Sequence, residues 1–408
     1  MPDKDRQNHP DQDDLKDLKI IVQDHLGNVI SGDATAIDED LSEQWIVERV
    51  SDGYALHRSV NDIKKVFLEV TSRCNLSCEN CVRNAWNEPL GDMKPETFDR
   101  IMEDLSALPE LREVYFGGYG EPLLHPDFEK MLERIKSLGV RVTLSTNGTL
   151  ITEEKAKALI DLRIDRIYVS MDSPKADLFR EIRGGADLDL VMENLKRVRV
   201  LRDERRSRFP TIGLEFVITN KNFDDIQKLP ALAREVGSSI VLLTHLLPHN
   251  EEMVDQIAYG REAIDIPNPE GWSILAGHFV MWGIISTPRS RWGANRRCRF
   301  VSDKGLVIGW DGGVSPCYAL LHSYPYYILG DKKQVSRYVL GNLKDSSLAE
   351  IWKSREYTLF RSTVTDFRFP SCVDCGLNCD LRQQNADCYA NEHSCADCLW
   401  AQDFIRCP

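Results

Sequence analysis

Between residues 64 and 244, short apolar runs alternate with longer stretches of helical periodicity. The short runs contain many β-branched residues, which predicts buried strands. These runs are Val66–Val70, Glu113–Phe116, Arg141–Ser145, Arg166–Ser170, Ile212–Ile218 and Ser239–Thr244. The longer stretches predict helices over residues 95–108, 126–138, 153–162, 187–201 and 223–236.

Helix boundary signals agree with this pattern. Pro95 and Pro126 suit the first helical turn, and Gly139 and Gly237 suit helix ends. Six strands that alternate with helices predict a parallel sheet with right-handed crossovers. The spacing alone does not decide between an open sheet and a partial barrel. In either case, reactive groups are expected at the carboxyl ends of the strands.

The flanking segments have different patterns. Residues 1–17 are polar without apolar periodicity, which predicts a disordered tail. Residues 18–60 hold short apolar runs around Gly27-Asn28 and Asp52-Gly53, which predicts a small β extension. The β–α repeat then occupies residues 64–283, and a segment rich in Gly, Pro and Cys covers residues 284–408.

Charge and composition narrow the possible functions. The 408 residues carry a formal net charge of -13, and the acidic excess is spread along the chain. A nucleic-acid-binding surface would need basic charge, so we expect no such partner. We find no signal peptide and no apolar run of membrane-spanning length, and therefore expect a soluble, cytoplasmic protein without a membrane partner. In a reducing compartment, 12 cysteines favour metal binding over disulfides.

The first chemical motif follows the first strand of the repeat. Cys74, Cys78 and Cys81 lie within eight residues of one loop, and the next cysteine is Cys298. A four-iron cluster normally takes four thiolates, so three local thiols predict one iron without a protein ligand. Such an iron can chelate the amine and carboxylate of a substrate. The alternative is a structural zinc site completed by a distant ligand.

This Cys-x3-Cys-x2-Cys motif resembles that of the radical S-adenosylmethionine (SAM) superfamily. The resemblance implies that Cys74, Cys78 and Cys81 are catalytic ligands of a [4Fe-4S] cluster whose open iron binds SAM. It also implies reductive cleavage of SAM to a 5′-deoxyadenosyl radical. The residue before the third cysteine is commonly aromatic in this superfamily, whereas this chain has Asn80, which leaves the packing near adenine open.

The ends of later strands supply candidate SAM contacts. By resemblance, Gly117, Gly118 and Glu121 form the glycine-glycine-glutamate element of the superfamily, which approaches the methionine ammonium group. Ser170 and Asp172 are candidate ribose contacts by the same resemblance. Glu215 either faces the cofactor pocket or completes a polar network. We interpret His245, at the end of the sixth strand, as an ordinary core histidine.

Nine cysteines of the C-terminal third form the second motif. They are Cys298, Cys317, Cys372, Cys375, Cys379, Cys388, Cys395, Cys398 and Cys407. Two Cys-x2-Cys pairs alone would favour a zinc ribbon, but nine thiols can fill two four-iron clusters with one left over.

Their order resembles the SPASM extension of radical SAM maturases, which implies two auxiliary [4Fe-4S] clusters. By analogy, Cys298 and Cys317 bind the inner cluster, and Cys372 and Cys375 bind the outer one. The spacing of the tail departs from the usual SPASM pattern, so the ligands among the remaining cysteines stay open.

A narrower resemblance covers most of the chain from Lys64. The stretches Cys81–Met93 and Cys395–Gln402, with Arg406-Cys407-Pro408, are similar to radical SAM maturases of tungsten enzymes. The resemblance implies modification of the tungsten pterin cofactor of an aldehyde ferredoxin oxidoreductase. It thereby implies that enzyme or its pterin as a partner, together with a reductant such as ferredoxin or flavodoxin.

We therefore predict an α/β fold, a partial (β/α)6 barrel of parallel strands with a small N-terminal β extension and a Cys-rich C-terminal auxiliary-cluster domain. Three functions remain open at this point. The first is a maturase for a tungsten pterin cofactor, and the second is a SPASM-type peptide maturase that forms a crosslink or thioether. The third is a non-catalytic zinc or iron-sulfur electron-transfer protein.

Overall fold

The computed structural model describes residues 19–23, 29–33, 45–50, 53–267, 284–293, 296–375 and 379–408. Its centre is a row of six strands: β5 (Lys65–Leu68), β6 (Glu113–Phe116), β7 (Arg141–Thr146), β8 (Arg166–Ser170), β9 (Thr211–Ile218) and β10 (Ser238–His245). Every pairing between neighbours in this row is parallel. The bounds agree with the predicted strands to within two residues at each end.

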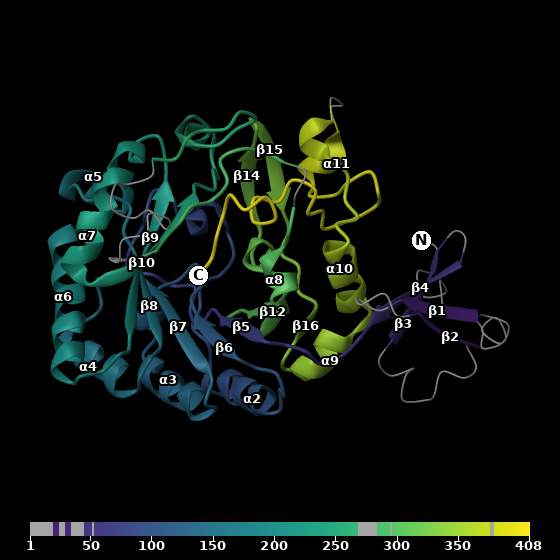
Figure 1. Cartoon of the computed structure of the whole chain (residues 1–408), viewed down its shortest axis with the longest axis horizontal. Coiled ribbons are helices and arrows are strands. Elements are labelled where there is room, and N and C mark those ends of the chain that lie inside the picture. The colour runs from purple at the N-terminus through teal and green to yellow at the C-terminus, as the bar shows by residue number, and fades with distance from the viewer. Residues whose placement is uncertain are drawn as a thin grey trace.

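Helices cover the outer face of this row (Figure 1). They are α2 (Pro95–Ser106), α3 (Phe128–Ser137), α4 (Glu153–Asp161), α5 (Ala176–Ile182), α6 (Leu188–Glu204) and α7 (Leu229–Val236). The short helix α5 was not predicted. The single helix predicted over 223–236 is instead a 3₁₀ helix, η5 (Phe223–Lys228), followed by α7. Pro230 explains the change, because a proline lacks the N–H that a continuous helix needs and suits a helix start.

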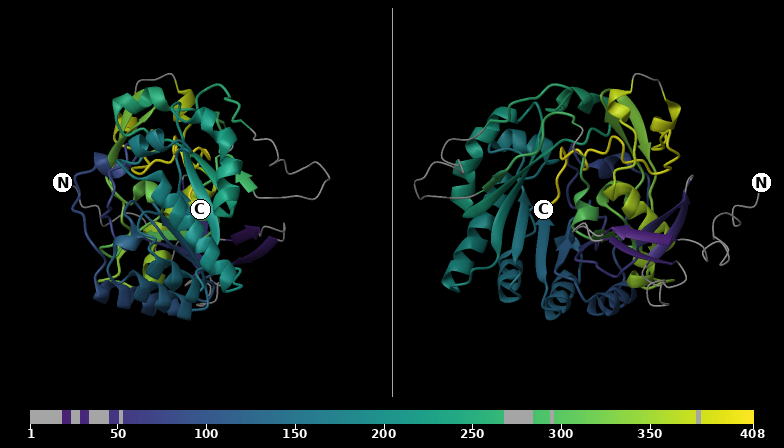
Figure 2. Two further views of the ribbon diagram at one scale, coloured as in Figure 1. Left: turned by 90° about the vertical axis from the view of Figure 1, so that its left-hand side faces the viewer. Right: turned by 45° about the vertical axis from the view of Figure 1, so that its right-hand side comes forward.

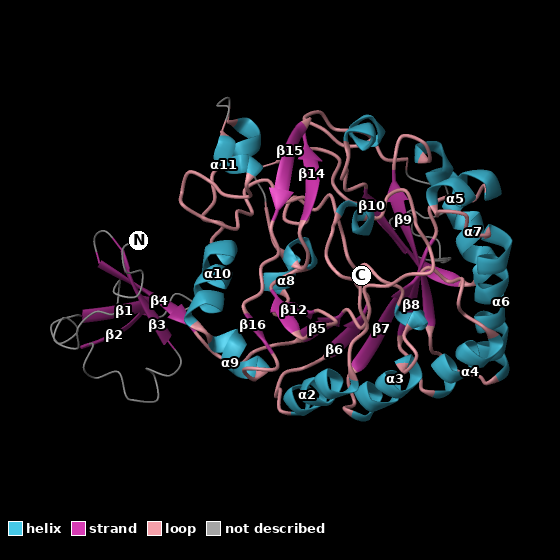
Figure 3. Ribbon diagram, turned by 180° about the vertical axis from the view of Figure 1, so that it is seen from behind, coloured by secondary structure: helices cyan, strands magenta, loops and turns pink. Residues whose placement is uncertain are grey.

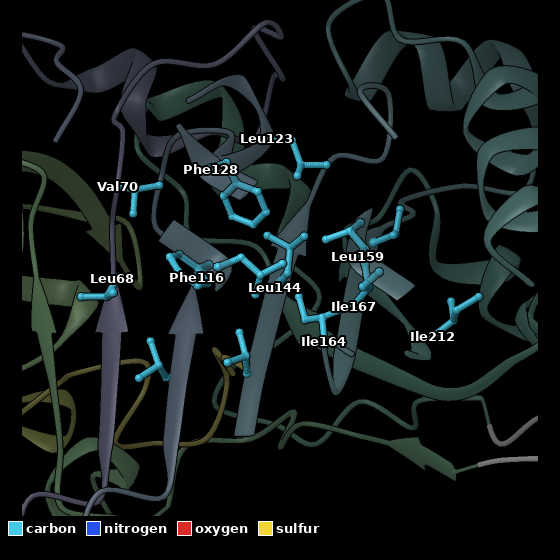
Figure 4. Packing of buried hydrophobic residues seen from close by; sticks show 14 of the residues in the cluster. Leu68, Val70, Phe116, Leu123, Phe128, Leu144, Leu159, Ile164, Ile167 and Ile212 are labelled. Atoms are coloured by element: carbon cyan, nitrogen blue, oxygen red, sulfur yellow. The ribbon is translucent and has the colours of Figure 1, made fainter. Parts of the chain in front are cut away.

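The core lies between the strands and these helices. Alternate strand residues point outward, and Leu68, Phe116, Leu144 and Ile167 from four neighbouring strands are fully buried with Phe128 of α3 (Figure 4). The residues between them point to the opposite face because side chains alternate along a strand. The inner face of the row is thereby free to build a site.

Further strands extend the sheet at both edges. They are β11 (Ile284–Ser286), β12 (Gly305–Ile308), β13 (Gly313–Ser315) and β16 (Gly341–Asn342). The strand order is β11-β10-β9-β8-β7-β6-β5-β12-β13-β16, so the barrel stays open. Strands β11 and β12 are parallel to their neighbours in the row, whereas β13 and β16 pair antiparallel.

Figures 1 and 3 show the strands as an arc with the helices outside, which confirms the predicted partial barrel of parallel strands. The right-hand view of Figure 2 shows these strands side by side, with the green and yellow C-terminal third at one end of the row. This end is the β5 side, because β12 pairs with β5.

The remaining elements of the described residues are hairpins and helices in the two flanking segments and short 3₁₀ helices in the loops. Antiparallel hairpins are formed by β1 (Lys19–Gln23) with β2 (Val29–Asp33), by β3 (Trp45–Val50) with β4 (Gly53–Arg58), and by β14 (Tyr324–Ile328) with β15 (Asp331–Val335). The C-terminal helices are α8 (Arg299–Ser302), α9 (Leu348–Lys353), α10 (Arg355–Thr365) and α11 (Asp380–Gln383). Five short 3₁₀ helices complete the list: η3 (Val82–Ala85), η4 (Pro122–Leu124), η6 (Glu251–Gln256), η7 (Tyr318–Leu320) and η8 (Cys372–Asp374).

Two predictions about the termini have different outcomes. The small N-terminal β extension is present as the β1–β2 and β3–β4 hairpins. The predicted disordered tail, residues 1–17, lies outside the described residues. Within the described ranges, no helix combines the length and apolar character needed to cross a membrane.

Candidate active site

A cavity of about 290 Å³ opens at the carboxyl ends of the central strands. One wall consists of the loops that follow β5 to β8 together with Glu215 of β9. The other wall consists of the end of β10, η7 and the last residues of the chain. Figures 1 and 3 accordingly show the C-terminus near the middle of the strand arc. This is the end of a parallel sheet at which α/β enzymes place their reactive groups.

The loop after β5 brings the three predicted cluster thiols to this cavity. Cys74, Cys78 and Cys81 all border it. The Cys81 amide donates to the Cys78 carbonyl over 3.1 Å, and the Asn84 side chain donates to the same carbonyl over 2.8 Å. Burial raises the pKa of the Cys74 and Cys81 thiols, so binding to a metal would displace their protons.

Two glycines allow neighbouring loops to pack closely on this cysteine loop. A Cβ atom on Gly120 would lie 2.1 Å from the Thr71 carbonyl oxygen. Gly184 has φ +59°, and a Cβ atom there would lie 2.4 Å from the Ser77 carbonyl oxygen. No larger residue fits either position without a shift of the backbone, so both glycines help to fix the cysteine loop.

The predicted glycine-glycine-glutamate element follows β6. Gly118 and Glu121 border the cavity, whereas Gly117 does not and lies against the ring of Tyr115. The Glu121 carboxylate accepts hydrogen bonds from the Thr146 hydroxyl at 2.8 Å and the Asn147 amide at 2.7 Å. Burial raises the pKa of Glu121. This carboxyl group therefore ties the loop after β6 to the loop after β7.

A buried ion pair stands behind the cysteine loop. Asp172 follows β8 and does not border the cavity, but its carboxylate lies 2.8 Å from Nε of Arg183. Arg183 does border the cavity, and its Nη1 lies 3.7 Å from Sγ of Cys78. Asn80 borders the cavity and donates to Asp172 over 3.3 Å, so it links the cysteine loop to this ion pair.

The sequence analysis missed Arg183. Its charge is almost fully buried, and it brings a cation to the cysteine loop from α5. A buried charge needs a partner of opposite charge, and Asp172 supplies it. The run Arg183-Gly184-Gly185 is the sequence signal that could have identified a basic residue at a close backbone contact.

Glu215 of β9 points into the cavity next to the end of β8. It accepts a hydrogen bond from the Ser145 hydroxyl over 2.5 Å, and Ser170 borders the same space. Burial raises the pKa of Glu215 to about 7. The carboxyl group therefore exchanges a proton in the neutral pH range, which suits a group that accepts or donates protons during a reaction.

The last residues of the chain form the opposite wall. Trp400 and residues 405–408 border the cavity. The His245 amide donates to the Phe404 carbonyl over 3.0 Å, and the Arg406 amide donates to the Thr244 hydroxyl over 3.0 Å. These bonds anchor the C-terminal segment on β10. Since the partners are far apart in the sequence, local patterns did not reveal this wall.

A buried histidine joins the C-terminal third to the barrel beside the cavity. His322 lies 2.9 Å from the Glu69 carboxylate and 2.6 Å from that of Glu88, and its ring lies against Trp86. Burial alone would lower the pKa of His322, but the two carboxylates raise it to about 9. Trp86 and Glu88 belong to the stretch Cys81–Met93, which is similar to radical SAM maturases of tungsten enzymes. Their contacts with His322 join this stretch to the C-terminal third.

The nine C-terminal cysteines do not form one group. Cys298, Cys317, Cys395 and Cys398 lie within electrostatic reach of one another. Burial raises the pKa of all four of these thiols. The structure therefore brings the predicted inner pair, Cys298 and Cys317, together with two cysteines that the sequence left unassigned.

Of the other five C-terminal cysteines, Cys372 packs against the same apolar cluster as Cys298, Cys395 and Cys398. Cys375 and Cys388 are exposed, and Cys372 and Cys379 are half-buried. Cys407 borders the candidate active site. Among the described residues, no three His, Cys, Asp or Glu side chains converge closely enough to hold a single metal ion. An iron-sulfur cluster distributes its thiolates over several irons.

The chain matches two family models. Residues 68–214 match the Radical SAM superfamily. Residues 298–380 match SPASM, described as an iron-sulfur cluster-binding domain. The first match ends just before Glu215, and the second includes five of the nine C-terminal cysteines: Cys298, Cys317, Cys372, Cys375 and Cys379.

Relatives and solved structures agree with these matches. The tungsten-containing aldehyde ferredoxin oxidoreductase cofactor-modifying protein of Pyrococcus furiosus is 38% identical over 349 residues, which cover 85% of this chain and 97% of that protein. Mycofactocin maturase MftC of Mycobacterium tuberculosis is 24% identical over 317 residues, which cover 76% of this chain and 74% of that protein. Streptococcus suis SuiB bound to S-adenosylmethionine superposes with a TM-score of 0.52 at 16% identity, over 82% of this chain and 74% of that one. This last likeness supports the fold alone.

Proposed function

The chain belongs to the radical SAM superfamily, within the family of the tungsten-containing aldehyde ferredoxin oxidoreductase cofactor-modifying protein, and on this premise we propose that it modifies the tungsten pterin cofactor of such an oxidoreductase. It is a radical SAM enzyme with a SAM-binding [4Fe-4S] cluster, SAM and auxiliary iron-sulfur clusters as cofactors. The observation that carries the proposed reaction is that three thiols of one loop border a single cavity at the strand ends.

We assign Cys74, Cys78 and Cys81 as the ligands of the SAM-binding cluster. Their loop supplies three thiolates, which fits a cluster with one iron left open for SAM. When bound, the reduced cluster and SAM supply a 5′-deoxyadenosyl radical through reductive cleavage of SAM. All three thiols border the cavity, so a substrate bound there would lie next to the proposed cluster.

Residues of this chain would orient SAM in the same cavity. Gly118 and Ser170 are the proposed direct contacts, because both border the cavity at strand ends. Arg183 brings a buried cation to the cysteine loop, and we propose that it attracts the carboxylate of SAM. Asp172 acts through Arg183 as a positioning residue, since its own oxygens are taken up inside the protein.

Glu121 and Glu215 receive different roles. Glu121 is held by hydrogen bonds from two loops, so we propose that it shapes the turn around Gly117 and Gly118 for the methionine end of SAM. Glu215 has one neighbouring hydroxyl and a pKa near neutrality, so it can hold or release a proton in the cavity. Tyr115 and Trp400 add aromatic surface to the wall of this cavity.

We further propose two auxiliary [4Fe-4S] clusters. Cys298, Cys317, Cys395 and Cys398 would bind the inner one, because their thiols lie within electrostatic reach of one another. Cys372, Cys375, Cys379 and Cys388 would bind the outer one. We propose the matching division into an N-terminal extension (18–60), a radical SAM barrel (64–283) and an auxiliary-cluster domain (284–408).

Two partners follow from the proposed reaction. One is the tungsten oxidoreductase or its pterin cofactor, as the name of the Pyrococcus furiosus relative indicates for that protein. The other is a one-electron reductant such as ferredoxin or flavodoxin, because cleavage of SAM consumes an electron.

The test uses the protein reconstituted anaerobically with iron and sulfide, SAM and a chemical reductant. The probe is the immature tungsten oxidoreductase, purified from cells that lack this protein. We expect 5′-deoxyadenosine formation to rise with the amount of the probe and the oxidoreductase to gain activity. The Cys78→Ala variant serves as the control and should do neither.

A peptide substrate is the main rival outcome. The same incubation is therefore repeated with candidate precursor peptides deuterated at carbon. Transfer of deuterium from a peptide into 5′-deoxyadenosine, with no response to the oxidoreductase, would replace tungsten cofactor modification by peptide maturation. Radical SAM chemistry itself would survive that outcome.

A further inference from the structure

Cys407 stands apart from the other cysteines of the C-terminal third. Four of those, Cys298, Cys317, Cys395 and Cys398, lie within electrostatic reach of one another. Cys407 packs against the aromatic cluster that contains Tyr115 and Tyr318, as Cys298 and Cys317 also do, but it alone of the nine borders the reaction cavity. Two clusters with four thiolates each use eight of the nine C-terminal cysteines. By its position, Cys407 is the thiol that remains.

On the same side, the cavity is bordered by residues whose buried polar groups lack a hydrogen-bond partner among the described residues. Neither the Tyr318 hydroxyl nor Nδ1 of His245 has a hydrogen-bond partner among the described residues. Both side chains border the cavity, with exposed fractions of only 6% and 2%. His245 Nε2 lies 2.8 Å from the Arg289 carbonyl, to which it must donate, so Nδ1 is left as an acceptor.

Buried polar groups are costly when they lack a partner. The free hydroxyl and the free imidazole nitrogen therefore indicate that a polar molecule binds on the Cys407 side of the cavity. The cysteine loop borders the opposite side. This arrangement leaves a space between the SAM-binding loop and the C-terminal segment for a substrate with hydrogen-bonding groups.

The state of the Cys407 thiol suits hydrogen transfer. Burial raises its pKa to about 12, so the sulfur keeps its hydrogen at neutral pH. An S–H bond is weaker than most C–H bonds, so a carbon radical can take this hydrogen atom. The Glu215 carboxyl group lies close enough to influence the thiol electrostatically, and it borders the same cavity.

From this placement, and resting on the proposed function, we infer that Cys407 is a free thiol that donates a hydrogen atom to a carbon radical in the cavity. In this step the S–H bond breaks homolytically, a C–H bond forms, and the unpaired electron moves to sulfur. The thiyl radical then takes one electron from the low-potential reductant that also drives SAM cleavage. A proton from Glu215 restores the thiol, and solvent reprotonates the carboxylate.

The first test needs no turnover. The reconstituted holoenzyme is treated anaerobically with iodoacetamide, and alkylated cysteines are mapped by mass spectrometry. Iodoacetamide attacks the thiolate, and burial keeps the pKa of Cys407 high, so alkylation of Cys407 should be slow at neutral pH and faster as the pH rises. We expect the cluster ligands to stay protected at each pH, and we expect SAM to slow the alkylation of Cys407. The Cys407→Ala variant should retain the iron content of the wild type. Loss of iron in this variant, or an alkylation rate of Cys407 that does not rise with pH, would overturn the inference.

The second test follows the hydrogen itself. SAM is cleaved in D2O without substrate, and the deuterium content of 5′-deoxyadenosine is measured. Because the thiol exchanges with solvent, we expect wild-type protein to give monodeuterated product and Cys407→Ala to lose most of that deuterium. The Tyr318→Phe variant is the matched control, since it removes another exchangeable hydrogen that borders the cavity and should keep the label.

The outcomes separate this inference from the proposed function. SAM cleavage with no deuterium in the wild-type product, or with equal deuterium in Cys407→Ala, would overturn the hydrogen-donor role alone. Loss of the label in Tyr318→Phe but not in Cys407→Ala would assign the role to the tyrosine and overturn the inference as well. Failure of the wild-type protein to cleave SAM would overturn the proposed function, while alkylation would still test whether Cys407 is free.

Discussion

The two walls of the cavity are built in opposite ways. The wall from Cys74 to Glu215 comes from consecutive strand-to-helix loops, and the hydrogen bonds of Glu121 connect the loop after β6 to the end of β7. The wall from Trp400 to Pro408 comes from a segment that returns across the molecule to β10. In the function that we propose, the first wall holds the SAM-binding cluster and the second wall meets the substrate. The proposed cluster site is therefore local in sequence, whereas the proposed substrate site depends on contacts between distant segments.

The largest expected effect is the loss of SAM cleavage when the cysteine loop of the first wall is changed while the auxiliary region stays intact. Cys78→Ala should abolish SAM cleavage, because it removes one of three thiolates from the proposed SAM-binding cluster. Iron analysis should show a loss of about four irons per chain, with the auxiliary iron retained. Cleavage at the wild-type rate would show that the loop does not hold the catalytic cluster.

The matched change in the auxiliary region should have a distinct signature. Cys317→Ala should remove about four irons per chain from the inner auxiliary cluster and leave the SAM response of the remaining cluster in place. Iron content and the electron paramagnetic resonance spectrum are the measurements. An unchanged iron content would exclude Cys317 as a ligand and would separate it from Cys298, Cys395 and Cys398.

A smaller effect concerns the carboxyl group between the two walls. Burial raises the pKa of Glu215 from an ordinary value of 4.5 to about 7, so the folded state favours its neutral form. This contribution to stability is complete below about pH 4.5 and is lost as the pH rises through 7, and it amounts to about 3 kcal/mol.

The Glu215→Gln variant stays neutral at every pH and should lack this part of the pH dependence. The free energy of unfolding, measured by denaturant titration from about pH 4.5 to above pH 7, compares the two proteins. If wild type and variant lose stability in parallel across this window, Glu215 ionises at an ordinary pKa and is not desolvated as described.

The smallest effect tests how the second wall is anchored. Thr244→Val removes the hydroxyl that accepts the Arg406 amide and should lower the free energy of unfolding by about 1 kcal/mol. Hydrogen exchange of the Arg406 amide should speed up, while exchange in the Cys74–Cys81 loop should not change. Equal acceleration in both regions would mean that the two walls are not independently anchored.

The same contrast explains what the sequence could predict. The six strands were predicted correctly because apolar periodicity is a local signal. Cysteine spacing is also local, and it singled out the three thiols that the structure brings to one cavity. The parallel pairing of β12 with β5 was not predicted, since Gly305–Ile308 pairs with a strand about 240 positions earlier. The split of the 223–236 helix could have been anticipated from Pro230.

Long-range contacts also limited the prediction of the site. Arg183 was missed because its role arises only when α5 brings it against Cys78 and Asp172. Cys407 was grouped with the cluster ligands because the number of cysteines in a sequence does not show where each one lies in the fold. In the structure it borders the reaction cavity, and its assignment there remains our inference.

The central claim is that the loop of Cys74, Cys78 and Cys81 holds an iron-sulfur cluster with an open iron for SAM. The most direct measurement is electron paramagnetic resonance of the reduced, anaerobically reconstituted protein with and without SAM. We predict that SAM changes the signal of one cluster and that Cys78→Ala removes this response while the auxiliary signals persist. A spectrum that SAM leaves unchanged, or a fourth protein side chain bound to that cluster, would contradict the claim.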